Sequence, residues 1–219
     1  MNVIALNLKT YSESAGKNAL ALLNACEKNT KKIQVILIPS LLDTTLISRA
    51  ARTVKIYVQY ADTVPVGAHT GHVPIELLPA IGVRGILINH AECRLPFIAI
   101  KHRVELAHKY KLETIICAKD DLEAAKLATL KPTYIAVEPP ELIGTGISVS
   151  TAKPELIKKS VNAIRKVNKQ VKILMGAGIS NNQDYKIAIK LGANGVLLAS
   201  AFIKSKDPKK WLNELTDRA

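Results

Sequence analysis

The chain is poor in cysteine, in aromatic residues and in long apolar runs. Its 219 residues include three cysteines, and Phe, Trp and Tyr together make up 4% of them. Cysteines that are few, odd in number and without a C-x-x-C pair argue against a disulfide framework and favour a reducing compartment. No apolar run reaches membrane-spanning length, and no signal-peptide pattern follows the first methionine. We therefore expect a cytoplasmic protein with no membrane partner.

Acidic residues are also scarce relative to basic ones, which leaves a net charge of +13. The lysines are nevertheless spread along the chain, in pairs such as Lys31-Lys32, Lys158-Lys159 and Lys209-Lys210. No basic stretch with interleaved aromatics and no zinc-finger spacing is present. This pattern favours a solvated lysine surface that attracts small anions, and it predicts no nucleic-acid partner. A basic binding protein without catalytic activity remains the alternative from a different functional class.

What the chain has in quantity is short apolar, β-branched runs separated by helical patterns. The interval between successive runs fits a helix and its return to a parallel strand. Such units, with no second domain left over, predict an α/β protein in which residues 1–219 form one (β/α)8 barrel. An open doubly wound sheet is the alternative, but its glycine-rich fingerprint is missing after the first run. The runs begin near Val3, Ile33, Lys55, Val83, Leu112, Thr133, Val171 and Ala193.

Several residues mark the ends of the predicted helices. Ser180 with Gln183 has the spacing of a capping box, and Gly192 would end the helix that follows. Pro154 and Pro208 stand where a first helical turn tolerates proline. These features are structural and predict no chemistry.

In a barrel of this kind the active site gathers at the carboxyl ends of the strands. The first predicted strand ends at Asn7 and Lys9, the fourth at His90 and the sixth at Glu138. The predicted site therefore combines an amide, a cation, an imidazole and a carboxylate.

Glu138 follows a buried run and opens a loop with prolines at one end and glycines at the other, residues 138–146. Stiff and permissive ends are typical of a lid, and a carboxylate beneath a lid is a candidate general base. His90 ends a strand beside a helix start, where a neutral imidazole can donate a hydrogen bond to a carbonyl oxygen.

Small residues follow the seventh and eighth strands, at Gly178 and Ser180 and at Ala199 and Ser200. Backbone N–H groups at such turns can converge on an anion, and the helix dipoles favour negative charge there. The turns therefore predict a phosphate site, a signal that many barrel enzymes share.

The remaining candidates carry little weight. His69 and His72 have a metal-like spacing but no third ligand nearby, so we predict no metal. His102 and His108 fall in a predicted helix and are expected to be exposed, whereas Cys93 is interpreted as a packing residue. Without a metal or a cofactor motif, a base, a neutral electrophile, a cation and a phosphate cradle suit proton abstraction next to a carbonyl.

Three segments of the chain resemble the triosephosphate isomerase family in its short archaeal form. The resemblance extends from Asn7 to about Ser205, and the motifs occur in family order. The segments are Asn7-Leu8-Lys9-Thr10-Tyr11, Asn89-His90-Ala91-Glu92, and Glu138-Pro139 followed by Ile143-Gly144-Thr145-Gly146.

The resemblance implies a TIM barrel, an enediolate mechanism and no cofactor. Glu138 would move the proton, His90 would polarise the carbonyl, and Lys9 would stabilise the enediolate with Asn7 beside it. The phosphate would be held by Ile143, Gly178, Ala199 and Ser200. Residues 66–72 resemble the loop through which family members associate, which implies a homo-oligomer, with a tetramer favoured over a dimer. Alternatives are other phosphate-binding barrels, such as a sugar-phosphate epimerase or an indole-glycerol-phosphate synthase.

Overall fold

The structure is a computed structural model that describes residues 2–27, 33–139, 154–177 and 179–216. In these residues eight parallel strands close into a barrel in sequence order, with β1 paired to both β2 and β8. The expected barrel is therefore confirmed, and each strand starts within two residues of its predicted start. The strands are β1 (Asn2–Asn7), β2 (Ile33–Ile38), β3 (Lys55–Val58), β4 (Gly85–Ile88), β5 (Glu113–Ala118), β6 (Tyr134–Val137), β7 (Lys172–Met175) and β8 (Gly195–Leu198).

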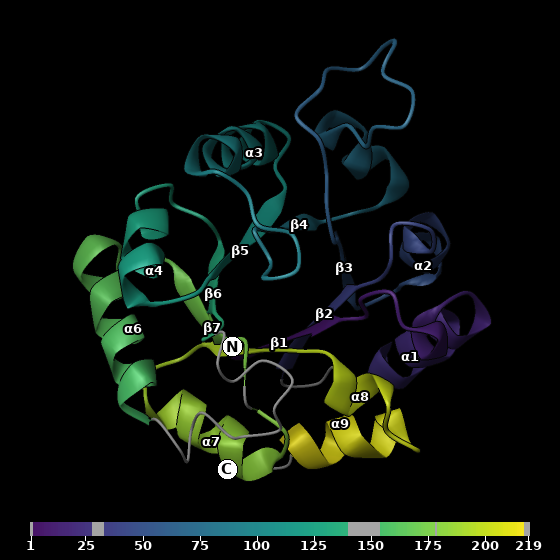
Figure 1. The fold of residues 1–219 in the computed structure, drawn as a ribbon. Helices are drawn as coiled ribbons and strands as arrows, with labels where there is room; N and C mark the ends of the chain where they lie inside the picture. The colour runs from purple at the N-terminus through teal and green to yellow at the C-terminus, as the bar shows by residue number, and fades with distance from the viewer. Residues whose placement is uncertain (1, 28–32, 140–153, 178, 217–219) are drawn as a thin grey trace.

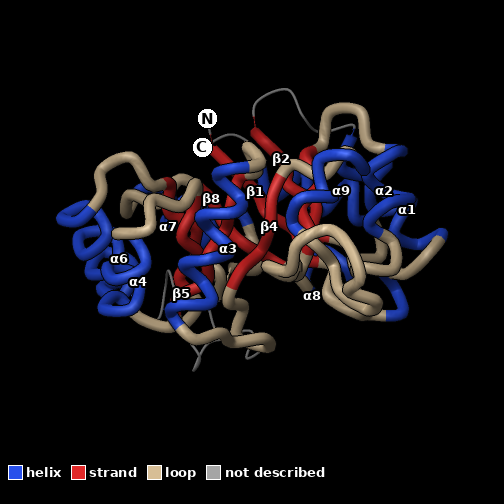
Figure 2. Tube along the Cα trace, turned by 90° about the horizontal axis from the view of Figure 1, so that it is seen from above, coloured by secondary structure: helices blue, strands red, loops and turns tan. Residues whose placement is uncertain are grey.

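Helices surround the strands on the outside (Figures 1 and 2). Side chains therefore pack on both faces of the sheet, which explains why the strands read as unbroken apolar runs. No helix in the described part of the chain is both long and apolar enough to cross a membrane. The helices are η1 (Ser12–Ser14), α1 (Lys17–Glu27), α2 (Thr44–Ala50), η2 (Ile75–Ile81), α3 (Phe97–Lys109), α4 (Asp121–Ala128), α6 (Pro154–Val167), α7 (Asn182–Lys190), α8 (Ser200–Ile203) and α9 (Pro208–Thr216).

The predicted helix ends are confirmed except at the start of α7. Pro154 and Pro208 are the first residues of α6 and α9, and Gly192 takes a positive φ of 102° just after α7. The cap of α7 is Asn181, whose side chain accepts a hydrogen bond from the backbone N–H of Asp184. The expectation that Ser180 would begin a capping box was thus wrong by one residue, because Asn181 is itself a strong cap.

The amino-terminal end of the barrel is filled by a partnered carboxylate. Glu113, at the start of β5, accepts hydrogen bonds from the Lys55 ammonium at 2.7 and 2.8 Å and from the Tyr57 hydroxyl. Tyr57 is fully buried inside the barrel, and Gly85 of β4 makes room for its ring. A substrate would therefore enter from the opposite, carboxyl-terminal end.

Closure of the barrel between β8 and β1 depends on Gly195. It pairs with Val3, and a Cβ atom at this position would overlap the Val3 carbonyl oxygen.

We predict that Gly195→Ala lowers the free energy of unfolding by about 3 kcal/mol or more, because backbone cannot yield as a flexible side chain can. Denaturant unfolding measures the loss. In Gly16→Ala, where the added Cβ meets open space at a φ of 55°, we expect a loss of about 1 kcal/mol. Equal losses in the two variants would contradict this account.

Candidate active site

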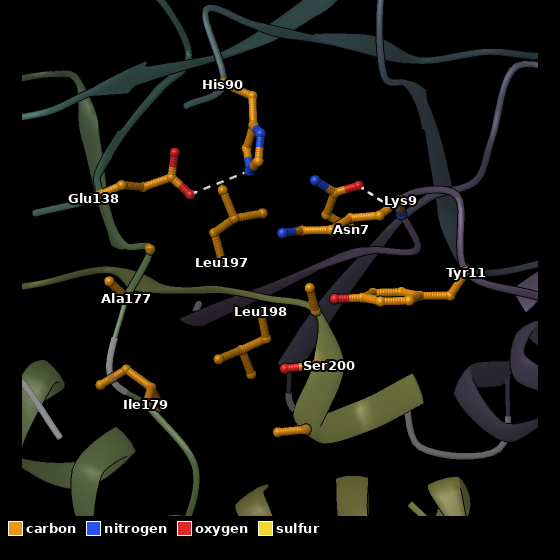
Figure 3. A pocket seen from close by; sticks show the side chains of 13 residues that line it. Asn7, Lys9, Tyr11, His90, Glu138, Ala177, Ile179, Leu197, Leu198 and Ser200 are labelled. Atoms are coloured by element: carbon orange, nitrogen blue, oxygen red, sulfur yellow. Dashed lines mark hydrogen bonds and ion pairs between the residues drawn. The ribbon is translucent and has the colours of Figure 1, made fainter. Parts of the chain in front are cut away.

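Six of the predicted site residues line one cavity at the carboxyl ends of the strands (Figure 3). The cavity has a volume of about 130 Å³, several times the space that a single water molecule needs. Its wall also includes Tyr11, Gly176 and Leu197. Two further predictions, Ile143 and Gly178, lie outside the described residues, as does the expected lid after Pro139. The six residues are Asn7, Lys9, His90, Glu138, Ala199 and Ser200.

His90 and Glu138 face each other across the cavity (Figure 3). The His90 Nε2 atom lies 3.5 Å from Glu138 Oε1. On the other side of the ring, Nδ1 accepts a hydrogen bond of 3.2 Å from the backbone N–H of Glu92. An accepting Nδ1 carries no proton, so the neutral ring bears its hydrogen on Nε2 and directs it into the cavity. In this geometry Nε2 is the ring nitrogen that can donate into the cavity.

Glu138 is a buried carboxylate with an incomplete set of partners. It is 5% exposed, and its Oε2 atom has no hydrogen-bond partner among the described residues. Burial raises the pKa of Glu138, while His90, Cys117 and Lys9 oppose the rise by favouring the charged form. A carboxylate that is poorly solvated and close to an N–H donor is a stronger base than one in water.

Two neighbours fix where the Glu138 side chain lies. A Cβ atom on Gly176 would overlap Glu138 Cγ, so the missing side chain at this position provides the space for the carboxylate. Cys117, fully buried on β5, contacts Glu138 and has a raised pKa because of its own burial. Cys117 is therefore a neutral thiol beside the carboxylate.

Lys9 is held in a left-handed backbone conformation, with a φ of 48°. Asn7 Oδ1 accepts a hydrogen bond of 3.0 Å from the Lys9 backbone N–H, and Gln59 Nε2 donates one of 2.9 Å to the Lys9 carbonyl oxygen. The ammonium group contacts Glu92 Oε1 at 2.5 Å, and Figure 3 shows the side chain crossing the cavity. Asn7 therefore lies beside Lys9 and orients its backbone.

The wall opposite Glu138 is made of small and hydroxyl-bearing residues. Ala199 precedes α8 and Ser200 begins it, and the Tyr11 hydroxyl points into the cavity on the same side as Ser200 (Figure 3). Lys9 brings a positive charge to the same cavity, so an anion bound here would lie between an ammonium group and small residues that allow close backbone approach.

Side chains outside the cavity differ in how well they match expectation. Cys93 is exposed, so its interpretation as a packing residue was wrong. It ends a turn in which its own backbone N–H donates to the His90 carbonyl oxygen, and its side chain faces solvent. His102 and His108 are exposed on α3, as predicted. The His69 and His72 rings meet edge to face, 6.2 Å apart. In the described ranges no group of three potential ligands lies together as a metal site would require.

Sequence reasoning gave no role to Tyr11, Gln59, Glu92, Gly176 or Cys117. Tyr11 and Glu92 belong to the quoted motifs and could have been found there. Gln59 follows β3 by one residue, so the strand-end rule reaches it too. Nothing in the sequence marks what Gly176 or Cys117 does, because both act through space next to Glu138.

A family model described as triosephosphate isomerase matches residues 2–216 of the chain. The chain is 43% identical to a triosephosphate isomerase of Methanoculleus marisnigri, over 97% of this chain and 96% of that protein. It is 41% identical to one of Methanothermus fervidus with the same two coverages, and 43% identical to one of Caldivirga maquilingensis over 97% and 95%.

The burial of Glu138 predicts a pH-dependent cost in stability. The pKa of Glu138 is raised above its ordinary value of 4.5. Its contribution to the free energy of unfolding is therefore fully present below pH 4.5 and is lost as the pH rises through the folded-state pKa. Glu138→Gln stays neutral. Its unfolding temperature should match that of the parent near pH 4 and exceed it at pH 7. The difference should be roughly 2–4 °C for each kcal/mol by which the free energy of unfolding increases.

Thermal unfolding across this pH range measures the effect. Glu113→Gln is the matched control, because it removes a carboxylate that Lys55 and Tyr57 already stabilise. It should lower the unfolding temperature at pH 7. A Glu138→Gln variant no more stable than the parent at pH 7 would contradict the inference that burial raises the pKa of Glu138.

Proposed function

Because the chain belongs to the triosephosphate isomerase family, we propose that it interconverts dihydroxyacetone phosphate and D-glyceraldehyde 3-phosphate through an enediolate, in glycolysis and gluconeogenesis. One observation carries the proposal beyond family membership: a buried carboxylate with a raised pKa lies 3.5 Å from the N–H of a neutral imidazole on a small cavity. Moving a proton between adjacent carbons requires a base, and the developing oxyanion requires a donor.

The two groups divide this chemistry between them. Glu138 takes a proton from one carbon and returns it to the next, so one carboxylate serves both half-reactions. His90 donates from Nε2 to the carbonyl oxygen, where negative charge develops, and shuttles protons between the two oxygens. A neutral imidazole suits this step because the acidity of its N–H is closer to that of an enediol than the acidity of an imidazolium would be. A glutamate base with a neutral histidine is the known arrangement of this enzyme family, and resemblance together with geometry supports these roles.

Lys9 supplies positive charge to the enediolate and to the phosphate. Its ammonium pairs with Glu92, whose side chain is 59% exposed, so the ion pair is accessible to solvent and contributes little to stability. An incoming phosphate can therefore take over the ammonium at small cost. Gln59 and Asn7 hold the Lys9 backbone in place during this exchange.

The phosphate itself would be bound by backbone groups at Ile143, Gly178, Ala199 and Ser200. The position of Ala199 and Ser200 on the cavity wall supports the second pair. The segment 138–146 would close over the site and exclude water, which would otherwise promote loss of phosphate from the intermediate.

We also propose a cytoplasmic homo-oligomer, a tetramer in preference to a dimer. The connection between β3 and η2 projects beyond the ring of helices (Figure 1). Val66 in this connection is 51% exposed, and Leu42, before α2, is 95% exposed. Apolar side chains that protrude in this way are typical of surfaces that another subunit covers.

The proposed reaction predicts that Glu138→Asp lowers kcat by orders of magnitude, about 100-fold or more, because withdrawing the carboxylate by one methylene spoils the geometry of proton transfer. A coupled assay on glyceraldehyde 3-phosphate measures the rate. Glu76→Asp, the same change at an exposed residue of η2, should leave it unaltered.

The same assay separates the competing functions. A metal-dependent epimerase would lose turnover on addition of a chelator, whereas the proposed isomerase would keep it. A basic binding protein would show no turnover and would bind nucleic acid equally well after Glu138→Ala. Parent-like turnover in Glu138→Asp would remove Glu138 as the base.

The oligomer proposal predicts a particle mass several times that of the 23.8 kDa chain in light scattering. Leu42→Glu should lower that mass, because a charge would be buried against the partner surface. Thr45→Glu, at an exposed polar position on α2, is the control. A parent that is monomeric at micromolar concentration would refute the proposal.

A further inference from the structure

Asn89, the residue before His90, has a backbone conformation that needs explanation. Its φ is 63°, in the left-handed region, and it is 2% exposed. Left-handed conformations are strained for most residues with a Cβ atom and persist only where the surroundings enforce them. Asparagine tolerates the region better than most residues, but glycine would fit with no cost at all. The asparagine side chain must therefore contribute something that glycine cannot.

The side chain joins three parts of the structure. Nδ2 donates a buried hydrogen bond of 2.9 Å to the Cys117 carbonyl oxygen at the end of β5. Oδ1 accepts one of 2.9 Å from the backbone N–H of Leu95, beyond the turn that contains His90. The Asn89 carbonyl oxygen accepts a further bond of 3.3 Å from Arg94 Nη1. Both ends of the turn are thus tied to one amide.

The point of attachment on β5 is shared with Glu138. The backbone N–H of Glu138 donates to the Ala118 carbonyl oxygen at 2.8 Å, one residue along from the Cys117 carbonyl that Asn89 holds. The Cys117 side chain also contacts Glu138. Because β5 lies between β4 and β6 in the barrel, it fixes both strand ends at once.

We propose that Asn89 is a positioning residue for the reaction: its amide sets the distance and angle between the His90 imidazole and the Glu138 carboxylate through β5. This inference rests on the proposed isomerase function. Asn89 does not belong to the described residues that line the cavity, so it acts on the reaction through His90. The proton-transfer geometry is sensitive to such support, since displacement by 1 Å costs about 100-fold in rate.

Asn89→Gly tests the proposal, because glycine retains the left-handed backbone and removes only the amide. We expect kcat to fall about 10- to 100-fold and KM to change less than about threefold. Lys111→Gly is the matched control: Lys111 has a φ of 56° but is exposed and lies after α3, away from the site. It should retain parent kinetics. A kcat for Asn89→Gly within about twofold of the parent would overturn the proposal.

A double-variant cycle separates positioning from general damage. In a His90→Gln background, Asn89→Gly should change kcat less than about twofold, because the group it positions is gone. An equal loss in both backgrounds would mean that Asn89 does not act through His90. If Asn89→Gly fails to fold, Asn89→Asp serves in its place, since it keeps the acceptor for Leu95 and loses the donor to Cys117.

A spectroscopic readout keeps this inference distinct from the proposed function. Nitrogen NMR of ¹⁵N-labelled histidine should show the parent His90 as the neutral tautomer with the proton on Nε2, as its bond from Glu92 requires. Asn89→Gly should shift His90 toward a mixture of tautomers, and an unchanged spectrum would overturn the positioning role. If the parent itself fails to isomerise triose phosphate, the proposed function fails, while the NMR comparison still decides whether Asn89 positions His90.

Discussion

The contact between Glu138 and His90 is the constraint on which the rest of the site depends. A carboxylate that is 5% exposed and has one oxygen without a partner among the described residues is costly to maintain. The barrel tolerates it because the backbone of Glu138 is fixed by β5 and because Gly176 leaves room for the side chain. The proposed base is thus kept poorly solvated before substrate arrives, at a cost in the stability of the protein.

Left-handed backbone conformations occur both in this region and at the opposite end of the barrel. Four non-glycine residues in the described ranges have positive φ, and two of them, Lys9 and Asn89, closely follow strands at the carboxyl end. Both are locked by side-chain amides, Lys9 by Asn7 and Gln59 and Asn89 by its own. The other two, Lys111 and Lys131, follow helices on the opposite side, where a left-handed residue is a common way to end a helix. The same conformation therefore serves positioning at one end and chain reversal at the other.

The comparison of sequence with structure shows which signals are local. Strands were predicted because burial on both faces produces unbroken apolar runs, and the convergence of Asn7, Lys9, His90 and Glu138 followed from one rule about barrel ends. The tautomer of His90 and the role of Gly176 could not be predicted, since each depends on atoms from distant segments or on the exact course of a turn. The prediction at Ser180 failed because the helix cap lies one residue later. The prediction at Cys93 failed because the direction of a turn decides whether its side chain is buried or exposed.

Glu113 and Glu138 show how one barrel treats the same side chain in two ways. Glu113, at the amino-terminal end, accepts hydrogen bonds from the Lys55 ammonium and the Tyr57 hydroxyl, so it joins the ends of β3 and β5 and both of its oxygens have partners. Glu138, at the carboxyl-terminal end, has the His90 N–H at 3.5 Å and an oxygen with no partner among the described residues. A complete set of partners makes a carboxylate structural, whereas an incomplete set leaves it free to accept a proton from a substrate. Among the described residues, the carboxylate that lacks a full set of partners is the one proposed to carry the chemistry.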